Sequence, residues 1–258
     1  MHDLPGFDYL AIFLGGICAG VMNAVAGGGT LVSFPILLWA GRDPIIANAT
    51  NALALWPGSL ASAWGFRREI ATLPRLLWFL VPAAVLGGLA GGWLLLVTPS
   101  KLFSSFVPYL ILFATALLGA KSLLARLGGS KPAQSHTIRH AGLLFASQLV
   151  VSVYGGYFGA GMGILMLATL GLYGLSDFHQ RNAIKNLLAA TTNGLAGIFF
   201  ICAGAVRWDD ALALGAGSAA GGLLGAAVGR RLSSRTLESA AIVVGVLATV
   251  VLLMRRHK

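Results

Sequence analysis

The stretch Asn23-Ala-Val-Ala-Gly-Gly-Gly-Thr-Leu-Val-Ser-Phe-Pro35 decides the fold, because three consecutive glycines interrupt a long apolar segment. The apolar run before the glycines covers residues 7–26, which is long enough to cross a bilayer as a helix. The run after them, residues 30–40, would be only about 16 Å long as a helix and cannot cross alone. The stretch therefore predicts a broken unit over residues 7–40 that returns to its starting side, either as a re-entrant hairpin or as two short tilted helices.

The rest of the chain has the composition of a membrane protein. Of its 258 residues, 57% are hydrophobic and 10% are charged, whereas soluble domains carry about 25% charged residues. Apolar runs of membrane-spanning length recur from end to end, which excludes a soluble enzyme, a disordered tail and a secreted disulfide scaffold. Cys18 and Cys202 lie inside such runs, and we interpret them as small hydrophobic residues rather than as a disulfide, metal ligands or nucleophiles. We expect a polytopic, all-α integral membrane protein embedded in the lipid bilayer.

The second half of the chain repeats the pattern of the first. A second glycine-rich break, Gly155-Gly-Tyr-Phe-Gly-Ala-Gly-Met-Gly163, precedes another short apolar run over residues 164–175. A displacement of 134 positions places Asn48 on Asn182 and Gly88 on Gly222, each with matching neighbours. Each repeat would have three full spans and one broken unit, giving eight to ten membrane segments in one integrated domain. The sequence thus predicts a first transmembrane repeat over residues 1–127, a polar cytoplasmic linker over residues 128–137 and a second repeat over residues 138–258.

Basic residues cluster in short loops between the apolar runs, where they set membrane orientation. The net charge is +10, but no water-exposed domain offers the contiguous basic face that nucleic acid requires, so nucleic acid is not expected as a partner. With the basic loops on the cytoplasmic side, the run over residues 45–66 points inward and its counterpart over residues 182–206 points outward. The two repeats are therefore predicted to be inverted, as is common in secondary transporters, and the basic C-terminal tail falls outside. The residues assigned to the cytoplasmic side are Arg67, Arg68, Arg75, Lys121, Arg126, Lys131, Arg139, Arg181, Lys185, Arg230, Arg231 and Arg235.

Both glycine breaks are candidate binding sites. Each break is followed by the start of a short helix, and a helix N-terminus offers free backbone N–H groups and a partial positive charge to an anion. Irregular backbone within a membrane persists only where protein or a water-filled cavity satisfies it. Close packing between helices is an alternative of about equal weight for these glycines. The candidate residues at the breaks are Gly27, Gly28, Gly29 and Thr30 in the first half, and Gly161 and Gly163 in the second.

Polar residues lie in the apolar runs that follow the breaks. Lys185 lies about three residues into such a run, where a buried charge is expensive, so it is interpreted either as a counter-charge for the substrate or as a side chain that snorkels to the interface. All eight acidic residues lie in loops or near segment ends, so the buried polar groups are mostly donors, which favours an anion as ligand. No catalytic residue, metal ligand or cofactor is predicted. The further candidate binding residues are Asn48, Thr50, Asn51, Asn182 and Asn193.

These motifs resemble the TauE/SafE family of membrane proteins, the sulfite exporter group. In the first half the resemblance rests on the stretch quoted above and on Ala47-Asn-Ala-Thr-Asn51; in the second half, the glycine-rich break and Arg181-Asn-Ala-Ile-Lys185 look like its degenerate repeat. The resemblance covers essentially the whole chain. It implies transport of a small sulfur oxyanion or organosulfonate, such as sulfite, sulfoacetate or a thiosulfate-like anion, across a bacterial inner membrane. The second half has Ala168 where the first has Pro35, and Met162 interrupts its glycine run, so the halves need not contribute equally to the site.

The pattern and the resemblance together predict a multi-pass secondary transporter of the inner membrane, with its anion site between the two breaks and alternating access between the repeats. Three other hypotheses stand beside it: a membrane enzyme, a scaffold or assembly protein without transport activity, and a transporter of a different small organic anion. The many small-residue faces would also allow a homodimer.

Overall fold

The computed structural model describes residues 6–120, 141–172, 175, 177–228 and 234–256, and within them every regular element is an α-helix. The all-helical expectation is confirmed. The linker expected over residues 128–137 lies outside the described residues. In chain order the helices are α1 (Gly6–Val25), α2 (Thr30–Trp39), α3 (Pro44–Gly65), α4 (Arg67–Ala71), α5 (Pro74–Val97), α6 (Ser100–Gly119), α8 (Ala141–Tyr157), α9 (Met162–Leu172), α10 (Phe178–Cys202), α11 (Trp208–Val228) and α12 (Ser234–Arg256).

The helices follow the predicted apolar runs, but some boundaries differ. Helix α10 covers residues 178–202 rather than 182–206. Several basic residues expected in loops lie in helices instead: Arg67 and Arg68 form the short helix α4, Arg75 lies in the first turn of α5, and Arg235 is the second residue of α12. Among the described residues, three helical segments are long and apolar enough to cross a membrane, namely Arg75–Val97 in α5, all of α6 and all of α10.

Helix boundaries follow local chemistry. The Asp43 side chain accepts a hydrogen bond from the Ile45 N–H at 2.9 Å, and Pro44 occupies the first turn of α3. The Asp177 side chain likewise accepts from the Gln180 N–H at 2.7 Å at the start of α10. Short acidic side chains satisfy exposed N–H groups at a helix start, and proline there loses no helical hydrogen bond.

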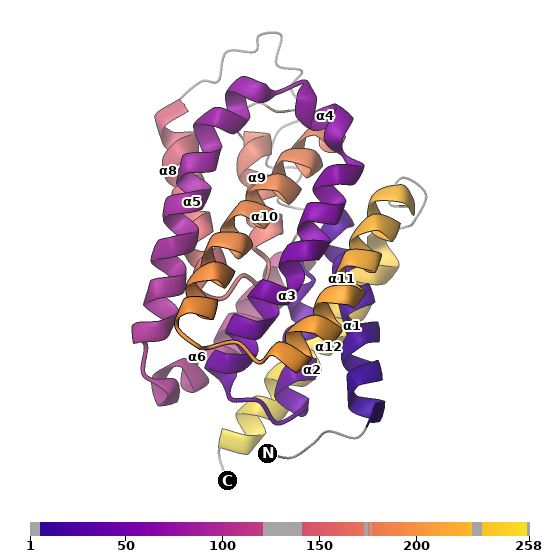
Figure 1. Cartoon of the computed structure of the whole chain (residues 1–258), viewed down its shortest axis with the longest axis vertical. Helices are drawn as coiled ribbons and strands as arrows, with labels where there is room; N and C mark the ends of the chain where they lie inside the picture. The colour runs from indigo at the N-terminus through magenta and orange to yellow at the C-terminus, as the bar shows by residue number, and fades with distance from the viewer. Residues whose placement is uncertain (1–5, 121–140, 173–174, 176, 229–233, 257–258) are drawn as a thin grey trace.

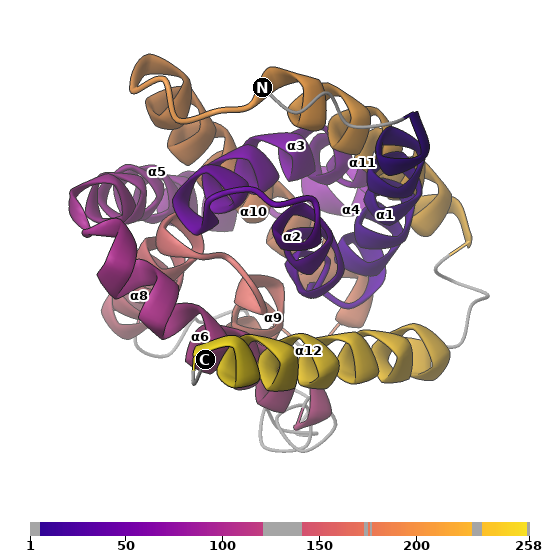
Figure 2. The ribbon, with the colours of Figure 1, turned by 90° about the horizontal axis from the view of Figure 1, so that it is seen from below.

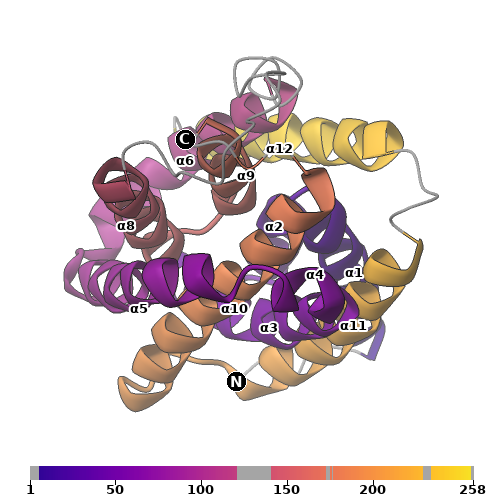
Figure 3. The same ribbon diagram turned by 90° about the horizontal axis from the view of Figure 1, so that it is seen from above.

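Each broken unit is a long helix followed by a short helix that packs back against it. Helix α1 ends at Val25 because Gly27 has a φ of +86°, a value that side-chain-bearing residues rarely adopt. Helix α8 ends in the same way before Gly159, whose φ is +79°. Helix α2 then contacts α1, and α9 contacts α8. In the views along the long axis, α2 and α9 lie inside a surround of longer helices (Figures 2 and 3).

The longer helices pack in two similar groups. Helix α11 packs between α1 and α3, whereas α5 packs against α8 and α10. Helices α3 and α10 contact each other across the two groups, and α6 pairs with α12, which crosses one side of the molecule at a slant (Figure 2). Glycines make the closest contacts: a Cβ on Gly20 would lie 2.3 Å from the Ser218 carbonyl oxygen of α11, and one on Gly88 would lie 2.8 Å from the Thr192 oxygen of α10. Small residues thus let the helix backbones approach closely.

Apart from the two breaks, the connections that the structure describes lie at two ends of the molecule (Figure 1). At one end, called the terminal end below, α1 begins, α12 ends, and Ser100 at the start of α6 donates a hydrogen bond to Asp43 at 3.1 Å. At the opposite end, called the α4 end, Gln180 at the start of α10 donates to the Thr72 hydroxyl that follows α4, at 3.4 Å. The exposed side chains of Arg67 and Arg68 lie at the α4 end.

Candidate functional site

The two glycine breaks meet in the interior of the protein. A Cβ on Gly27 would lie 2.8 Å from the Cα of Gly163, and a Cβ on Gly163 would lie 2.7 Å from the Cα of Gly27. The backbones are therefore in direct contact, and a side chain at either position would force them apart. Residues 136 positions apart in the sequence come together here, at the end of α1 and at the start of α9.

Each half of the chain supplies an asparagine that binds the end of the other half's broken helix. The Nδ2 of Asn182, on α10, donates to the Ala24 carbonyl oxygen of α1 at 2.7 Å. The Nδ2 of Asn48, on α3, donates to the Tyr157 carbonyl oxygen of α8 at 2.8 Å. The last carbonyls of a helix have no partner within the helix, and in an apolar interior an unsatisfied carbonyl is costly. These two predicted binding residues therefore hold the breaks in place.

Lys185 is 1% exposed, so its side chain does not snorkel to the surface. Its Nζ donates to the Asn23 carbonyl oxygen at 2.6 Å, with the Ala24 oxygen at 3.5 Å. A cation near a helix C-terminus is stabilised by the carbonyls there and by the negative end of the helix dipole. The end of α1 thus fixes the only lysine among the buried residues of the described chain beside the first break.

A cavity lies where the breaks meet. It contains about 320 Å³ of space not filled by atoms, counting the part open to solvent. Among the described residues that line it, Lys185 is the one charged residue and none carries a carboxylate. The Nδ2 of Asn186 is buried there without a hydrogen-bond partner. The lining residues are Asn23, Gly27, Thr30, Ser59, Gly159, Met162, Gly163, Lys185, Asn186, Ala189 and Asn193.

Both short helices begin at this cavity. Thr30 is the first residue of α2, and Met162 and Gly163 are the first two of α9. No side chain caps the start of α2, although the Gly29 N–H is taken by the Asn23 side-chain oxygen at 2.7 Å. The positive ends of two helix dipoles therefore point to the same space that holds the Lys185 charge.

The structure separates the predicted site residues into two groups. Outside the cavity lining, Asn51 accepts from the Ser33 hydroxyl at 2.5 Å, and Thr50 accepts from the Arg207 N–H at 3.0 Å at the terminal end. Gly28, Gly29 and Gly161 also lie outside the lining, as do the two helix-binding asparagines. The predicted residues that line the cavity are Gly27, Thr30, Gly163, Lys185 and Asn193.

Sequence reasoning missed three polar residues of the lining, Asn23, Ser59 and Asn186. Asn186 is four residues after Asn182, and this helical spacing could have placed the two side chains on the same face. Ser59 has no signal in the sequence, because a serine in an apolar helix usually bonds its own backbone, as Ser59 does with the Leu55 carbonyl at 3.1 Å. A fourth missed residue, Asp210, is fully buried at the start of α11 although it lies near a segment end.

Comparison with protein families agrees with this architecture. The family model described as "Sulfite exporter TauE/SafE" matches residues 12–252, which include both breaks and every residue of the cavity lining. The chain belongs to this family. As a TauE/SafE protein it is a membrane protein of a transporter family rather than of an enzyme family.

Curated relatives of this TauE/SafE protein are named as transporters. It is 33% identical to a "Probable membrane transporter protein" of Haemophilus influenzae, over 86% of this chain and 85% of the relative. It is 29% identical to "Probable membrane transporter protein ORF9" of Sinorhizobium sp, over 90% of this chain and 85% of that one. It is also 29% identical to "Probable membrane transporter protein YfcA" of Escherichia coli K12, over 88% of this chain and 80% of that one.

Proposed function

We propose that this TauE/SafE protein is a multi-pass secondary transporter that moves a small sulfur-containing anion, sulfite or an organosulfonate, across the bacterial inner membrane by alternating access. The observation that carries the proposal is the cavity between the two breaks, where a buried lysine, amide and hydroxyl groups and two helix N-termini converge without a carboxylate in the lining. Such a set of donors stabilises negative charge and disfavours a cation. The proposal that the anion contains sulfur comes from the family description, "Sulfite exporter TauE/SafE".

The donors around the cavity suit an oxyanion. The Lys185 ammonium supplies the charge, and Asn186 and Asn193 add amide groups on the same helix. Met162 and Ala189 supply an apolar part of the wall. An oxyanion that leaves water can regain hydrogen bonds from these groups, which lowers the free-energy cost of burying it in an apolar interior.

Two inverted repeats are part of the proposal. The reciprocal bonds of Asn48 and Asn182 support it, because these positions correspond in the two halves and each reaches the opposite broken helix. In inverted-repeat transporters the substrate site lies at the repeat interface, and access alternates as one repeat rocks against the other. The contact between Gly27 and Gly163 joins the two halves at that interface.

The thermal stability of the detergent-purified protein tests the anion site. The panel is sulfite, sulfate, thiosulfate, sulfoacetate, taurine and chloride, and a ligand at 100 times its Kd stabilises the protein by about 2.7 kcal/mol. We expect one sulfur anion to raise the melting temperature and Lys185→Met to abolish that rise, because methionine keeps the apolar stem and removes the charge. Lys101→Met is the matched control: Lys101 is exposed at the start of α6, so the rise should remain.

Asn186→Asp tests the same site without disturbing the end of α1. The aspartate has nearly the same shape and replaces an amide nitrogen that has no partner, but it adds negative charge to the cavity. We expect it to weaken anion binding at least about tenfold, which corresponds to 1.4 kcal/mol. Binding as tight as in the wild type would show that the anion site lies elsewhere.

Uptake into proteoliposomes separates transport from binding alone. We expect the wild type to take up the radiolabelled anion that raised the melting temperature. Lys185→Met should lose this uptake and Lys101→Met should keep it. A folded protein that binds none of the panel and takes none up would support a scaffold or assembly role. Stabilisation by acetate, a carboxylate without sulfur measured beside the panel, but by no sulfur anion would instead indicate a transporter of a different small organic anion.

A further inference from the structure

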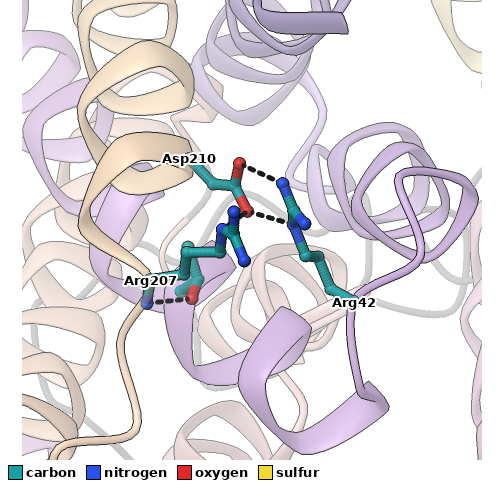
Figure 4. A network of polar contacts seen from close by, with 4 residues as sticks. Arg42, Arg207 and Asp210 are labelled. Carbon is teal, nitrogen blue, oxygen red and sulfur yellow. Dashed lines mark hydrogen bonds and ion pairs between the residues drawn. The ribbon is translucent and has the colours of Figure 1, made fainter. Parts of the chain in front are cut away.

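A buried ion pair joins the two halves of the chain at the terminal end. Asp210, on the first turn of α11, is 0% exposed and accepts from Arg42 through two bonds, at 2.6 Å from Nε and 3.1 Å from the terminal guanidinium nitrogen (Figure 4). The Arg42 side chain is only 9% exposed and comes from the connection between α2 and α3. Two parallel bonds between a guanidinium and a carboxylate fix both distance and orientation.

Arg207 makes a second link between the same segments. Its Nε lies 3.5 Å from an Asp210 oxygen, and its backbone N–H donates to the Thr50 hydroxyl of α3 at 3.0 Å (Figure 4). The first turn of α11 is therefore held to the α2–α3 connection, and the connection before α11 is held to α3. We call the Arg42–Asp210 pair with Arg207 and Thr50 the terminal-end cluster.

Helix α2 connects this cluster to the cavity. Its first residue, Thr30, lines the cavity, and Arg42 follows three residues after its last residue, Trp39. Between these ends, Phe34 is fully buried and packs edge-on against Phe158, which follows α8, with ring centroids 5.3 Å apart. Movement of α2 and the connection after it would therefore change both the ion pair to α11 and the aromatic contact to Phe158.

We infer that the terminal-end cluster is the lock that holds the transport path closed at the terminal end, and that it separates when this end opens. The inference rests on the proposed alternating access. A buried ion pair suits a reversible lock, because the attraction between its charges is largely offset by the cost of removing both from water. When the end opens, both charges regain water, so separation of an intact pair costs little, whereas a single unpaired charge left in the closed state is strongly unfavourable.

The test measures access to the cavity from each side of the membrane. In a background with Cys18 and Cys202 replaced by serine, Ala189→Cys places a thiol in the cavity lining. Its labelling by a membrane-impermeant thiol reagent is timed in right-side-out and inside-out vesicles. Lys101→Cys, exposed at the start of α6, identifies which vesicle type presents the terminal end.

Asp210→Asn and Arg42→Gln should each speed labelling from the terminal end by about tenfold or more, because each removes the two-bond ion pair from the closed state. Asp210→Asn leaves the Arg42 charge buried without its carboxylate, and Arg42→Gln leaves Asp210 with the longer contact to Arg207 at 3.5 Å. The double variant Arg42→Gln/Asp210→Asn should label more slowly than either single variant, since neither partner charge remains. Asp209→Asn is the matched control, as Asp209 is the exposed neighbour on the same helical turn, and its labelling should equal that of the wild type.

Unchanged labelling from the terminal end in both single variants, with the proteins inserted and folded, would overturn the lock. So would equal acceleration by Asp209→Asn. The anion proposal is judged separately by thermal stability with the anion panel. Faster labelling in Asp210→Asn without any anion-dependent stabilisation would support the lock and reject the anion site. Anion-dependent stabilisation with unchanged labelling would support the anion site and reject the lock.

Discussion

A polar residue at the breaks can bind a substrate or can hold a helix end in place, and the sequence does not distinguish these two roles. Lys185 was recognisable as an unusual charge within an apolar run, but its contact with the Asn23 carbonyl depends on where α1 ends relative to α10. Asn48 and Asn182 were equally recognisable, yet the structure uses their amide donors on backbone carbonyls. The residue type shows that a buried donor needs an acceptor. Which group accepts depends on how the helices pack, and this cannot be read from the sequence.

Gly27 allows the sharpest test at this scale. We expect Gly27→Ala to lower stability by about 2–4 kcal/mol, because the positive φ disfavours a side chain and the new Cβ would collide with the Gly163 backbone. Gly28→Ala is the matched control. Its nearest neighbour is the flexible methyl end of Met22 at 2.7 Å, so its cost should stay below about 1 kcal/mol. Reversible unfolding in mixed micelles measures both, and equal losses would contradict the proposed contact between the breaks.

Helices were the most predictable level of this protein. Runs of apolar residues end at glycines, prolines and acidic caps, and those signals are local, so most helix boundaries could be read from the sequence to within a few residues. Helix α10 differs most, because it begins directly after the Asp177 cap, four residues before the apolar run expected over residues 182–206. Helix α4 was missed because it is five residues long and carries no apolar periodicity. The pairing of α11 with α1, or of α5 with α8, could not be read, because almost every face of these helices is apolar and small-residue stripes occur on most of them.

The reciprocal asparagine bonds give a prediction for the broken helices. Asn182→Ala and Asn48→Ala should each destabilise the protein by about 1–3 kcal/mol, because each removes the short hydrogen bond to a helix-end carbonyl. After Asn182→Ala the Ala24 carbonyl retains the longer contact with the Lys185 Nζ, at 3.5 Å. Thr191→Ala is the control: that hydroxyl bonds only the Leu187 carbonyl of its own helix, at 3.0 Å, and its loss should cost less than about 0.5 kcal/mol. Unfolding free energies in mixed micelles are the measurement. Losses no larger than that of Thr191→Ala would show that the carbonyls find other donors.

At the scale of the whole molecule, charge and connectivity together predict orientation. Arg67, Arg68 and Arg181 lie at the α4 end or next to it, which the positive-inside bias assigns to the cytoplasm. The terminal end, with the start of α1 and the end of α12 (Figure 1), is then predicted to face the periplasm. The meeting of the two breaks could be anticipated from the repeat, but the cluster around Asp210 could not, because it joins two connections 168 residues apart.

Cysteine labelling in intact cells checks this orientation. In the background without native cysteines, Lys101→Cys should react with a membrane-impermeant reagent, and Arg68→Cys should react only after the cells are permeabilised. Both positions are exposed in the structure, so access to the reagent depends on the side of the membrane alone. Labelling of Arg68→Cys in intact cells, with Lys101→Cys protected, would reverse the assignment.

The bond between Asn182 and Ala24 has a consequence for how the protein is made. The two residues are 158 positions apart, so at a synthesis rate of 5–20 residues per second the carbonyl at the end of α1 waits roughly 8–30 s for its donor to leave the ribosome. During that interval the first broken unit has left the ribosome but lacks the partner that holds its turn. The first half of the protein is thus completed only after the second half has been translated. A chain whose synthesis stalls between the two halves would expose a helix end without its hydrogen-bond donor, which the membrane insertion machinery or a protease could recognise.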